Sequence, residues 1–193
     1  ISGPGLVAGY YGDEERTADV LKDGRVYMGE IFEIREEGDL KMIDRKKDIM
    51  VTSGGKNITP TLIENSIKAS PYISEVIVFA HGRKFPCALI EIEFQTVAEW
   101  ARRNKIQYTG FSSLAEHPEV CNLIREEVDK GNSHLARVEQ VKKFRIISQE
   151  LDPEAGETTP TRKIKRDLIY EMFGNMIEEM YQDKERESLS KLF

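Results

Sequence analysis

The sequence contains few cysteines and histidines, and neither type is arranged for metal binding. Its two cysteines, Cys87 and Cys121, are too few for a disulfide framework and do not have the spacing of metal ligands. This usage fits a reducing compartment. The three histidines, His81, His117 and His134, are scattered and form no HExxH-like pair. We interpret them as surface or turn residues.

Other absences narrow the class of protein further. No apolar run approaches the length needed to span a membrane, and Ile1 begins no signal peptide, so we expect a soluble protein. Its 28 Lys and Arg residues are outnumbered by 34 Asp and Glu residues, for a formal charge of −6. This excess of acidic residues argues against a general nucleic-acid binder. The sequence also contains no internal repeat.

The length bounds the number of domains. A chain of 193 residues accommodates one domain with a real core, or one domain plus a fragment of another. Because it starts at Ile1 and not at Met, we expect a piece of a longer protein. Residues 1–43 consist of short β segments and an acidic stretch through Asp19. We expect this region to be too short to bury a core of its own.

From Arg45 onward the pattern is mixed α and β, which predicts an α+β fold class. Helices are predicted at about residues 60–69, 96–104 and 118–130. Strands are predicted at 76–80 and 87–92, most simply as an antiparallel hairpin, with a third strand at 144–147. A last helix follows residue 166 and has an apolar stripe at three- and four-residue spacing, made of Leu168, Ile169, Met172, Phe173, Met176, Ile177 and Met180.

A glycine-rich hairpin is predicted at residues 49–58. Two short strands flank the tight turn Ser53-Gly54-Gly55-Lys56, whose glycines allow positive φ or close approach of another backbone. Thr59 and Pro60 then provide the cap and first position of a helix. Such glycines are often required only by the turn. A functional requirement at Gly54 is the alternative.

A basic loop precedes the last helix, with the sequence Thr159-Pro160-Thr161-Arg162-Lys163-Ile164-Lys165-Arg166. Runs of charge usually face solvent, so a solvated helix start is the simplest interpretation. The alternative is a loop whose lysine reaches an anion.

Five motifs in order give the chain its resemblance to a known family. They are Gly3-Pro4-Gly5 with Gly9-Tyr10-Tyr11, Asp23-Gly24 with Gly29-Glu30-Ile31, Asp44-Arg45-Lys46-Lys47-Asp48, Ser53-Gly54-Gly55-Lys56-Asn57, and the basic loop. The set resembles the adenylate-forming synthetases. The insert between Phe94 and Val141, together with the form of the last motif, looks most like long-chain fatty acyl-CoA synthetases.

The resemblance implies a C-terminal lid domain, with a β-hairpin and a three-stranded sheet packed by helices. Residues 1–44 would be the β-rich end of the large N-terminal adenylation domain, 45–181 the lid domain, and 182–193 a polar tail. The implied activity is that of an acid–thiol ligase. It activates a fatty acid with ATP to acyl-AMP and transfers the acyl group to coenzyme A, and we expect the fragment alone to be inactive.

Roles for single residues are implied by the same resemblance. Lys163 matches the catalytic lysine of the first half-reaction, Arg45 a ribose-binding arginine, and Lys47 the hinge about which the lid domain swings. The turn of the glycine hairpin, Ser53, Gly54, Gly55 and Lys56, would line the pantetheine tunnel in the second half-reaction. The remaining cations of the basic loop are candidate contacts for coenzyme A phosphates, namely Arg162, Lys165 and Arg166.

One position departs from the pattern of the family. Where Thr-Gly-Asp is usual, this sequence has Met28-Gly29-Glu30, so the carboxylate expected to bind the ribose hydroxyls is carried by a longer side chain. Bidentate geometry tolerates a displaced carboxylate poorly. Either ATP binds with adjusted geometry, or the protein has changed in substrate or activity.

The implied substrates are fatty acid, ATP and coenzyme A, with Mg²⁺ bound mainly by the N-terminal domain and no metal site in this part. The N-terminal domain is the expected partner, nucleic acid is not, and the expected location is the cytoplasm, with peripheral membrane contact left open. Alternatives are a medium-chain or aryl-CoA ligase, an acyl-AMP ligase that loads a carrier protein, and a regulatory module that uses the basic loop to hold an acidic partner.

Overall fold

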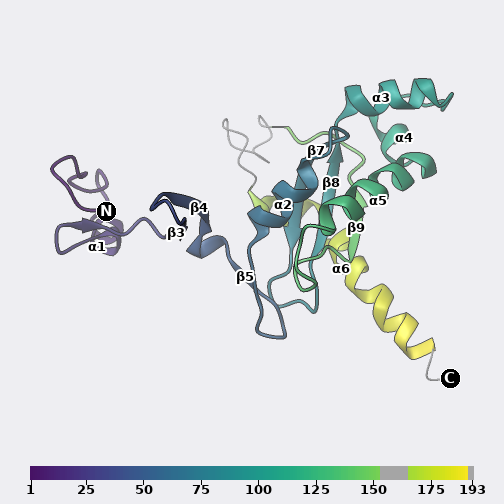
Figure 1. The fold of residues 1–193 in the computed structure, drawn as a ribbon. Coiled ribbons are helices and arrows are strands. Elements are labelled where there is room, and N and C mark those ends of the chain that lie inside the picture. Colours follow the sequence, from purple (N-terminus) through teal and green to yellow (C-terminus); the bar gives the residue numbers. More distant parts are fainter. Residues whose placement is uncertain (153–164, 191–193) are drawn as a thin grey trace. The chain divides into compact units, whose positions relative to one another are not determined.

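The computed structural model describes residues 1–152 and 165–190, with side chains up to residue 182 (Figure 1). The chain divides into two compact units, Ile1–Asp48 and Ile49–Phe193. Helices and strands are mixed along both, in agreement with the predicted mixture of α and β structure. None of the helices in the described ranges has the length and apolar character needed to cross a membrane.

The first unit contains a short helix and two β-hairpins. Helix α1 (Glu14–Val20) begins after Asp13, whose carboxylate accepts a hydrogen bond from the Arg16 N–H at 2.9 Å. Strands β1 (Leu21–Lys22) and β2 (Arg25–Val26) are joined by Asp23 and Gly24, which have φ of +52° and +67°. Two consecutive positive φ values are typical of tight hairpin turns. Strand β3 (Glu30–Ile34) pairs antiparallel with β4 (Leu40–Arg45), and a 3₁₀ turn, η1, follows at Lys46–Asp48.

In this first unit, which the structure describes throughout, no apolar side chain is buried. Four apolar residues share one face of the β3–β4 hairpin, because Phe32 is opposite Met42 and Ile34 is opposite Leu40. Their exposed fractions run from 41% for Phe32 to 76% for Ile34. The burial therefore agrees with the expectation that residues 1–43 form no core of their own.

The second unit begins with a small hairpin and is built around a three-stranded sheet. Strands β5 (Met50–Val51) and β6 (Asn57–Ile58) form the predicted glycine hairpin. The sheet has the order β7 (Ile73–Phe79), β8 (Cys87–Ile92), β9 (Lys143–Ile146), in which β7 is antiparallel and β9 parallel to β8. Both the hairpin of β7 with β8 and the third strand were predicted. All six residues of β8 are buried, as expected for a central strand.

Side chains alternate between two cores, one on each face of this sheet. On β7, Val76 and Val78 enter one core and Ile77 the other; on β8, Ile90 and Leu89 divide in the same way. Helices α2 (Pro60–Lys68) and α5 (Pro118–Asn132) contribute to the first core, and α6 (Arg166–Ser190) contributes to the second. The sheet is therefore a middle layer between helices.

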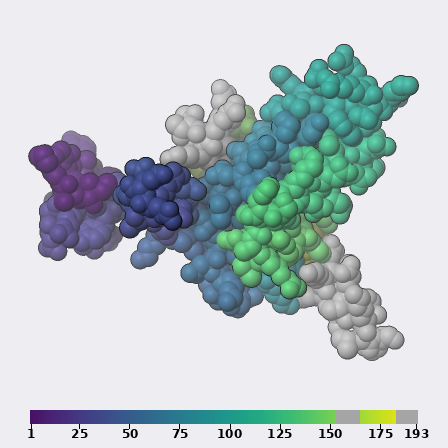
Figure 2. Space-filling model, in the orientation of Figure 1, coloured from purple at the N-terminus to yellow at the C-terminus, as the bar shows by residue number. Residues whose placement is uncertain are grey.

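Helices α2 and α5 approach each other closely at Gly131. A Cβ there would lie 2.8 Å from Cγ1 and 3.0 Å from Cα of Ile67, so this crossing requires glycine. The Ser66 hydroxyl donates a hydrogen bond to the Gly131 carbonyl at 3.0 Å across the same contact. In the space-filling view the green residues that include α5 lie directly against the blue residues that include α2 (Figure 2).

Some details of the sequence-based predictions were wrong. Helices α1 and α4 (Phe111–Ala115) were not predicted, because both are short and lack an extended apolar period. Helix α3 (Phe94–Arg103) starts two residues before the predicted position. Met172 was assigned to the apolar face of the last helix but is 42% exposed, whereas Ile169, Ile177 and Met180 of the same helix are buried. The face against the sheet is thus narrower than the sequence stripe.

Candidate functional site

The turn of the glycine hairpin is closed by Thr52. Its backbone N–H donates to the Lys56 carbonyl at 2.9 Å, and its hydroxyl accepts from the Lys56 N–H at 3.1 Å. The Gly55 N–H donates back to the Thr52 carbonyl at 2.9 Å. Thr52 is buried, whereas Ser53, Gly54, Gly55 and Lys56 are exposed. Three hydrogen bonds to Thr52 therefore hold the turn in a defined conformation, in which residues 53–56 are exposed to solvent.

Only one of its two glycines is required by the turn. Gly55 has φ of +71°, a conformation that strains side chains other than glycine. Gly54 has no such φ, and the nearest atom to a Cβ built on it is Thr52 Oγ1 at 4.0 Å. The turn requirement considered for Gly54 from the sequence belongs to Gly55. Nothing in the described part of the chain excludes a side chain at residue 54.

The glycine hairpin rests on the loop between β7 and β8. The Ser53 N–H donates to the Arg83 carbonyl at 2.9 Å, and the Gly82 N–H donates to the Val51 carbonyl at 2.8 Å. A longer contact, 3.4 Å, runs from the Val51 N–H to Nδ1 of His81. His81 is exposed in a turn, as predicted, but it also accepts this hydrogen bond. No sequence pattern predicted these contacts, which join segments about 30 residues apart.

The basic loop is only partly within the described residues. Arg162 and the predicted catalytic residue Lys163 lie outside them. Lys165 is exposed directly before α6. Arg166, the first residue of α6, forms an ion pair with Glu64 of α2 at 2.5 Å.

Glu64 has a side chain that is 13% exposed and has two partners. Its Oε1 also accepts a hydrogen bond from the Val78 N–H at 2.9 Å. Burial raises the pKa of Glu64, because the loss of solvation outweighs the attraction of Arg166 and the hydrogen bond from Val78. Such a pair contributes little net stability but is costly to break, since one charge is then left buried alone. It thus defines where α6 starts relative to α2 and β7.

Two predicted ribose-binding residues, Glu30 and Arg45, lie opposite each other. They are partners in the β3–β4 register, at the end of the hairpin next to η1. Oε2 of Glu30 is buried and has no hydrogen-bond partner. A buried carboxylate oxygen without a donor is unusual in a folded protein. The carboxylate of Glu30 therefore has an unused acceptor atom in this arrangement.

The predicted hinge residue, Lys47, is exposed in the middle of η1. The division between the two compact units falls between Asp48 and Ile49, so that only Asp48 separates Lys47 from it. Glu30 and Arg45 lie in the unit before this division, and the glycine hairpin lies in the unit after it.

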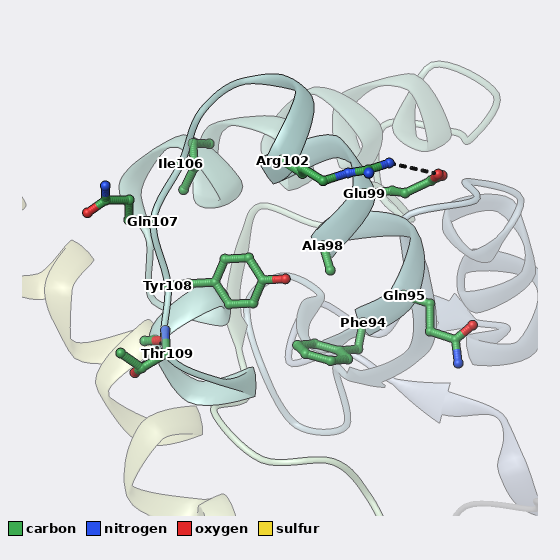
Figure 3. A pocket seen from close by; sticks show the side chains of 10 residues that line it. Phe94, Gln95, Ala98, Glu99, Arg102, Ile106, Gln107, Tyr108 and Thr109 are labelled. Carbon is green, nitrogen blue, oxygen red and sulfur yellow. Dashed lines mark hydrogen bonds and ion pairs between the residues drawn. The ribbon is translucent and has the colours of Figure 1, made fainter.

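An open groove of about 910 Å³ lies beside α3 (Figure 3). Phe94 and Tyr108 form its aromatic part, with their rings edge to face at 6.3 Å. Glu99 and Arg102 form an ion pair at its rim, at 3.6 Å. Its lining includes none of the predicted site residues that the structure describes. The groove is therefore not part of the predicted site.

A second hollow is strongly acidic. Glu91 is buried there and accepts a hydrogen bond from the Leu151 N–H at 2.8 Å, and burial raises the pKa of this carboxyl. Other carboxylates that line the hollow are Glu75, Glu93, Glu150 and Asp152. Across the described ranges, no three His, Cys, Asp or Glu side chains are grouped so that they could hold a metal ion. These residues therefore do not fit a resident Mg²⁺ ion.

Comparison with protein families gives one match that covers most of the chain. The model of the AMP-binding enzyme C-terminal domain matches residues 47–185. The match includes the glycine hairpin, the three-stranded sheet and the basic loop.

Curated relatives extend the similarity to nearly the whole chain. The long-chain-fatty-acid–CoA ligase FadD15 of Mycobacterium tuberculosis is 34% identical over 182 residues, which cover 94% of this chain and 30% of that protein. The long-chain-fatty-acid–CoA ligase 1 of Homo sapiens is 32% identical over 187 residues, or 94% of this chain and 26% of that protein. The chain thus spans less than a third of the length of these relatives.

A solved structure shows the same fold. The A domain of the carboxylic acid reductase from Segniliparus rugosus, in complex with AMP and a co-purified carboxylic acid, aligns with a TM-score of 0.72 and 18% identity. The alignment covers 92% of this chain and 27% of that one. At this identity the likeness shows the fold alone.

Proposed function

This chain belongs to the family of AMP-binding enzyme C-terminal domains, and from that membership we propose that it is the C-terminal part of a long-chain fatty acid–CoA ligase. The observation that carries the proposal is the 34% identity to such a ligase along 94% of the chain. In the first half-reaction a fatty acid carboxylate attacks the α-phosphate of ATP, which gives acyl-AMP and pyrophosphate. In the second, the thiol of coenzyme A displaces AMP and forms the thioester.

Lys163 is proposed to act in the first half-reaction. A cation held where the carboxylate and the phosphate oxygens meet stabilises the negative charge that gathers there. A lysine suits this role because its long stem carries a point charge into a crowded site. Loss of one such group typically lowers the rate by about 10²- to 10³-fold.

Gly54 and its neighbours Ser53, Gly55 and Lys56 are proposed to line the passage for the pantetheine arm in the second half-reaction. The support is the geometry of the turn, which requires glycine at residue 55 but has room for a side chain at residue 54. The absence of a Cβ at Gly54 therefore has no explanation within the turn. A passage for the pantetheine arm would explain the glycine at residue 54, because any side chain there would narrow it.

Glu30 and Arg45 are proposed to bind the ribose hydroxyls of the nucleotide. Their cross-strand pairing and the unpartnered Oε2 of Glu30 support this assignment despite the longer side chain at residue 30. Lys47 is proposed as the hinge, supported by its exposed position next to the division between the two units. Residues 1–44 are proposed to be the end of the adenylation domain, and Mg²⁺ to be held outside this chain.

Among the proposed contacts for coenzyme A phosphates, Lys165 is exposed and Arg166 is engaged by Glu64. Lys165 is therefore the better placed of these two described cations. Arg162 stays a prediction from the sequence.

The test separates the two half-reactions in the full-length enzyme. Lys163→Ala is expected to lower acyl-adenylate formation by at least about a hundredfold, measured by pyrophosphate exchange, and to spare thioester formation from supplied acyl-adenylate. Gly54→Leu is expected to do the reverse. Equal loss of both steps in either variant would contradict the assignment.

A second candidate is an acyl-AMP ligase that loads a carrier protein. The sequence motifs leave this alternative open, and the A–PCP didomain of the carboxylic acid reductase from Segniliparus rugosus shares the fold, with a TM-score of 0.72 and 18% identity. The acceptor decides between the two. Acyl transfer to coenzyme A supports the ligase proposed here, and transfer to a carrier protein alone supports the second candidate.

A further inference from the structure

The side chain of Arg83 connects the loop under the glycine hairpin to helix α6. Its backbone carbonyl accepts the hydrogen bond from Ser53, as described above. Its guanidinium forms an ion pair with Glu178 and donates a longer hydrogen bond to the Tyr170 hydroxyl at 3.4 Å. One residue therefore touches the hairpin with its main chain and α6 with its side chain.

Aromatic contacts strengthen the connection on the α6 side. The Arg83 guanidinium lies over the ring of Tyr181, 4.8 Å from its centre, in the arrangement of a cation–π contact. The Tyr181 hydroxyl donates to the Phe79 carbonyl at 2.9 Å and approaches the Phe85 carbonyl at 3.3 Å. The loop between β7 and β8 is thus attached to α6 on both sides of Arg83.

Glu178 is arranged to remain charged. The Tyr170 hydroxyl donates to its carboxylate at 2.6 Å. This hydrogen bond and the Arg83 guanidinium lower the pKa of Glu178 against the opposing effect of burial. The carboxylate of Glu178, which accepts the hydrogen bond from Arg83, is therefore ionised at neutral pH.

We propose that Arg83 is a positioning residue, through which helix α6 holds the glycine hairpin in place for the transfer to coenzyme A. The catalytic consequence depends on the function proposed above for the hairpin. The physical connection does not, because it is made of contacts among described residues.

The alternative is an ordinary surface ion pair with no influence on the hairpin. Arg83 and Glu178 have side-chain exposures of 33% and 34%, and pairs this exposed contribute little to global stability. The chain offers a matched control in Lys68 and Glu75, which join α2 to β7 at 2.7 Å with exposures of 34% and 16%. Truncating either cation to Met removes a similar ion pair.

The test compares Arg83→Met and Lys68→Met in the full-length enzyme. Native-state hydrogen exchange of the Ser53 and Gly82 amides is expected to accelerate roughly three- to tenfold in Arg83→Met and to stay unchanged in Lys68→Met. The KM for coenzyme A should rise by a similar factor in Arg83→Met, with pyrophosphate exchange unchanged. Arg83→Lys, which keeps the charge but loses the planar fork, should recover part of the difference.

Unchanged exchange at Ser53 in Arg83→Met, or equal acceleration in Lys68→Met, would overturn the proposal. A wild-type enzyme that transfers no acyl group to coenzyme A would refute the proposed function instead. In that case the hydrogen exchange still decides whether Arg83 holds the hairpin.

Discussion

The two compact units of the chain are stabilised in different ways. In residues 1–48 no apolar side chain is buried, and the hairpins depend on turns and on hydrogen bonds between neighbouring strands. In the unit that begins at Ile49, helices cover both faces of a sheet, and the central strand is buried along its whole length. Full burial of an aliphatic side chain contributes about 1.5–3 kcal/mol. Turn chemistry therefore shapes a hairpin, but burial of apolar surface supplies most of the stability.

The largest expected difference in stability is between a variant that removes core atoms from the second unit and one that removes surface atoms from the first. Leu89→Ala on strand β8, where Leu89 is fully buried, should lower the free energy of unfolding by about 3 kcal/mol. Ile34→Ala, where Ile34 is 76% exposed, should change it by less than about 0.5 kcal/mol. Urea unfolding of the chain of residues 1–193, followed by circular dichroism, measures both. Similar losses in the two variants would break the comparison.

A second pair of variants tests how tightly the core-bearing unit is packed. Gly131→Ala places a Cβ against Ile67 and should cost about 2 kcal/mol, as overpacking of a close helix contact usually does. Gly174→Ala in α6 meets its nearest atom at 3.8 Å and should stabilise by about 0.5–1 kcal/mol, because alanine favours the helix. The same unfolding experiment measures the change in the free energy of unfolding for both variants, which should have opposite signs. A stabilising Gly131→Ala would show that α2 and α5 separate easily.

A third pair asks whether turn chemistry acts in the core-bearing unit as it does in residues 1–48. Gly55→Ala should cost about 1–2 kcal/mol, because φ of +71° is a left-handed conformation that alanine disfavours. Gly54→Ala should be close to neutral in stability, since its Cβ meets only Thr52 Oγ1 at 4.0 Å. Thermal unfolding of the two variants measures the difference. A larger loss of stability in Gly54→Ala than in Gly55→Ala would show that the turn requires glycine at residue 54.

The smallest effect concerns charge at the surface of α6. The pKa of Glu178 is lowered in the folded protein, so its stabilising contribution is present above the ordinary pKa of a glutamate and is lost as the pH falls through the lower folded value. Glu178→Gln should therefore reduce stability at pH 7, by less than about 1 kcal/mol because the pair is one-third exposed. Unfolding curves from pH 7 to pH 2 should show this difference vanish. A difference that persists at pH 2 would indicate a packing effect instead.

Much of the second unit was predictable because its patterns are local. Two apolar runs, residues 76–80 and 87–92, flank the turn that begins at His81-Gly82, which predicted the β7–β8 hairpin. Pro60 and Pro118 stand at the first positions of α2 and α5. The short helices α1 and α4 were missed for the same reason, since neither shows an apolar period. Burial along α6 was predicted for Ile169 but not correctly for Met172, because the width of a buried face depends on the neighbouring sheet.

The site was predictable to a lesser degree. The sequence motifs selected the glycine hairpin and the basic loop, but not Thr52, which closes the hairpin with its hydroxyl. They also gave no indication of Glu64 or Arg83. Each of these two contacts α6 about a hundred residues away, at Arg166 and Glu178, and no local pattern reports such a distance.

The sequence by itself determined the elements that depend on neighbouring residues. These are the tight turn at Asp23-Gly24, the starts of the longer helices, the apolar runs of β7 and β8, and the motifs of the family. Tertiary structure alone decided that the turn needs glycine at residue 55 and not at 54, that Arg166 is held by Glu64, and that Arg83 joins the hairpin to α6. The reason is that φ preferences and periodicity act over a few residues, whereas ion pairs and cores form between segments that only the fold brings together.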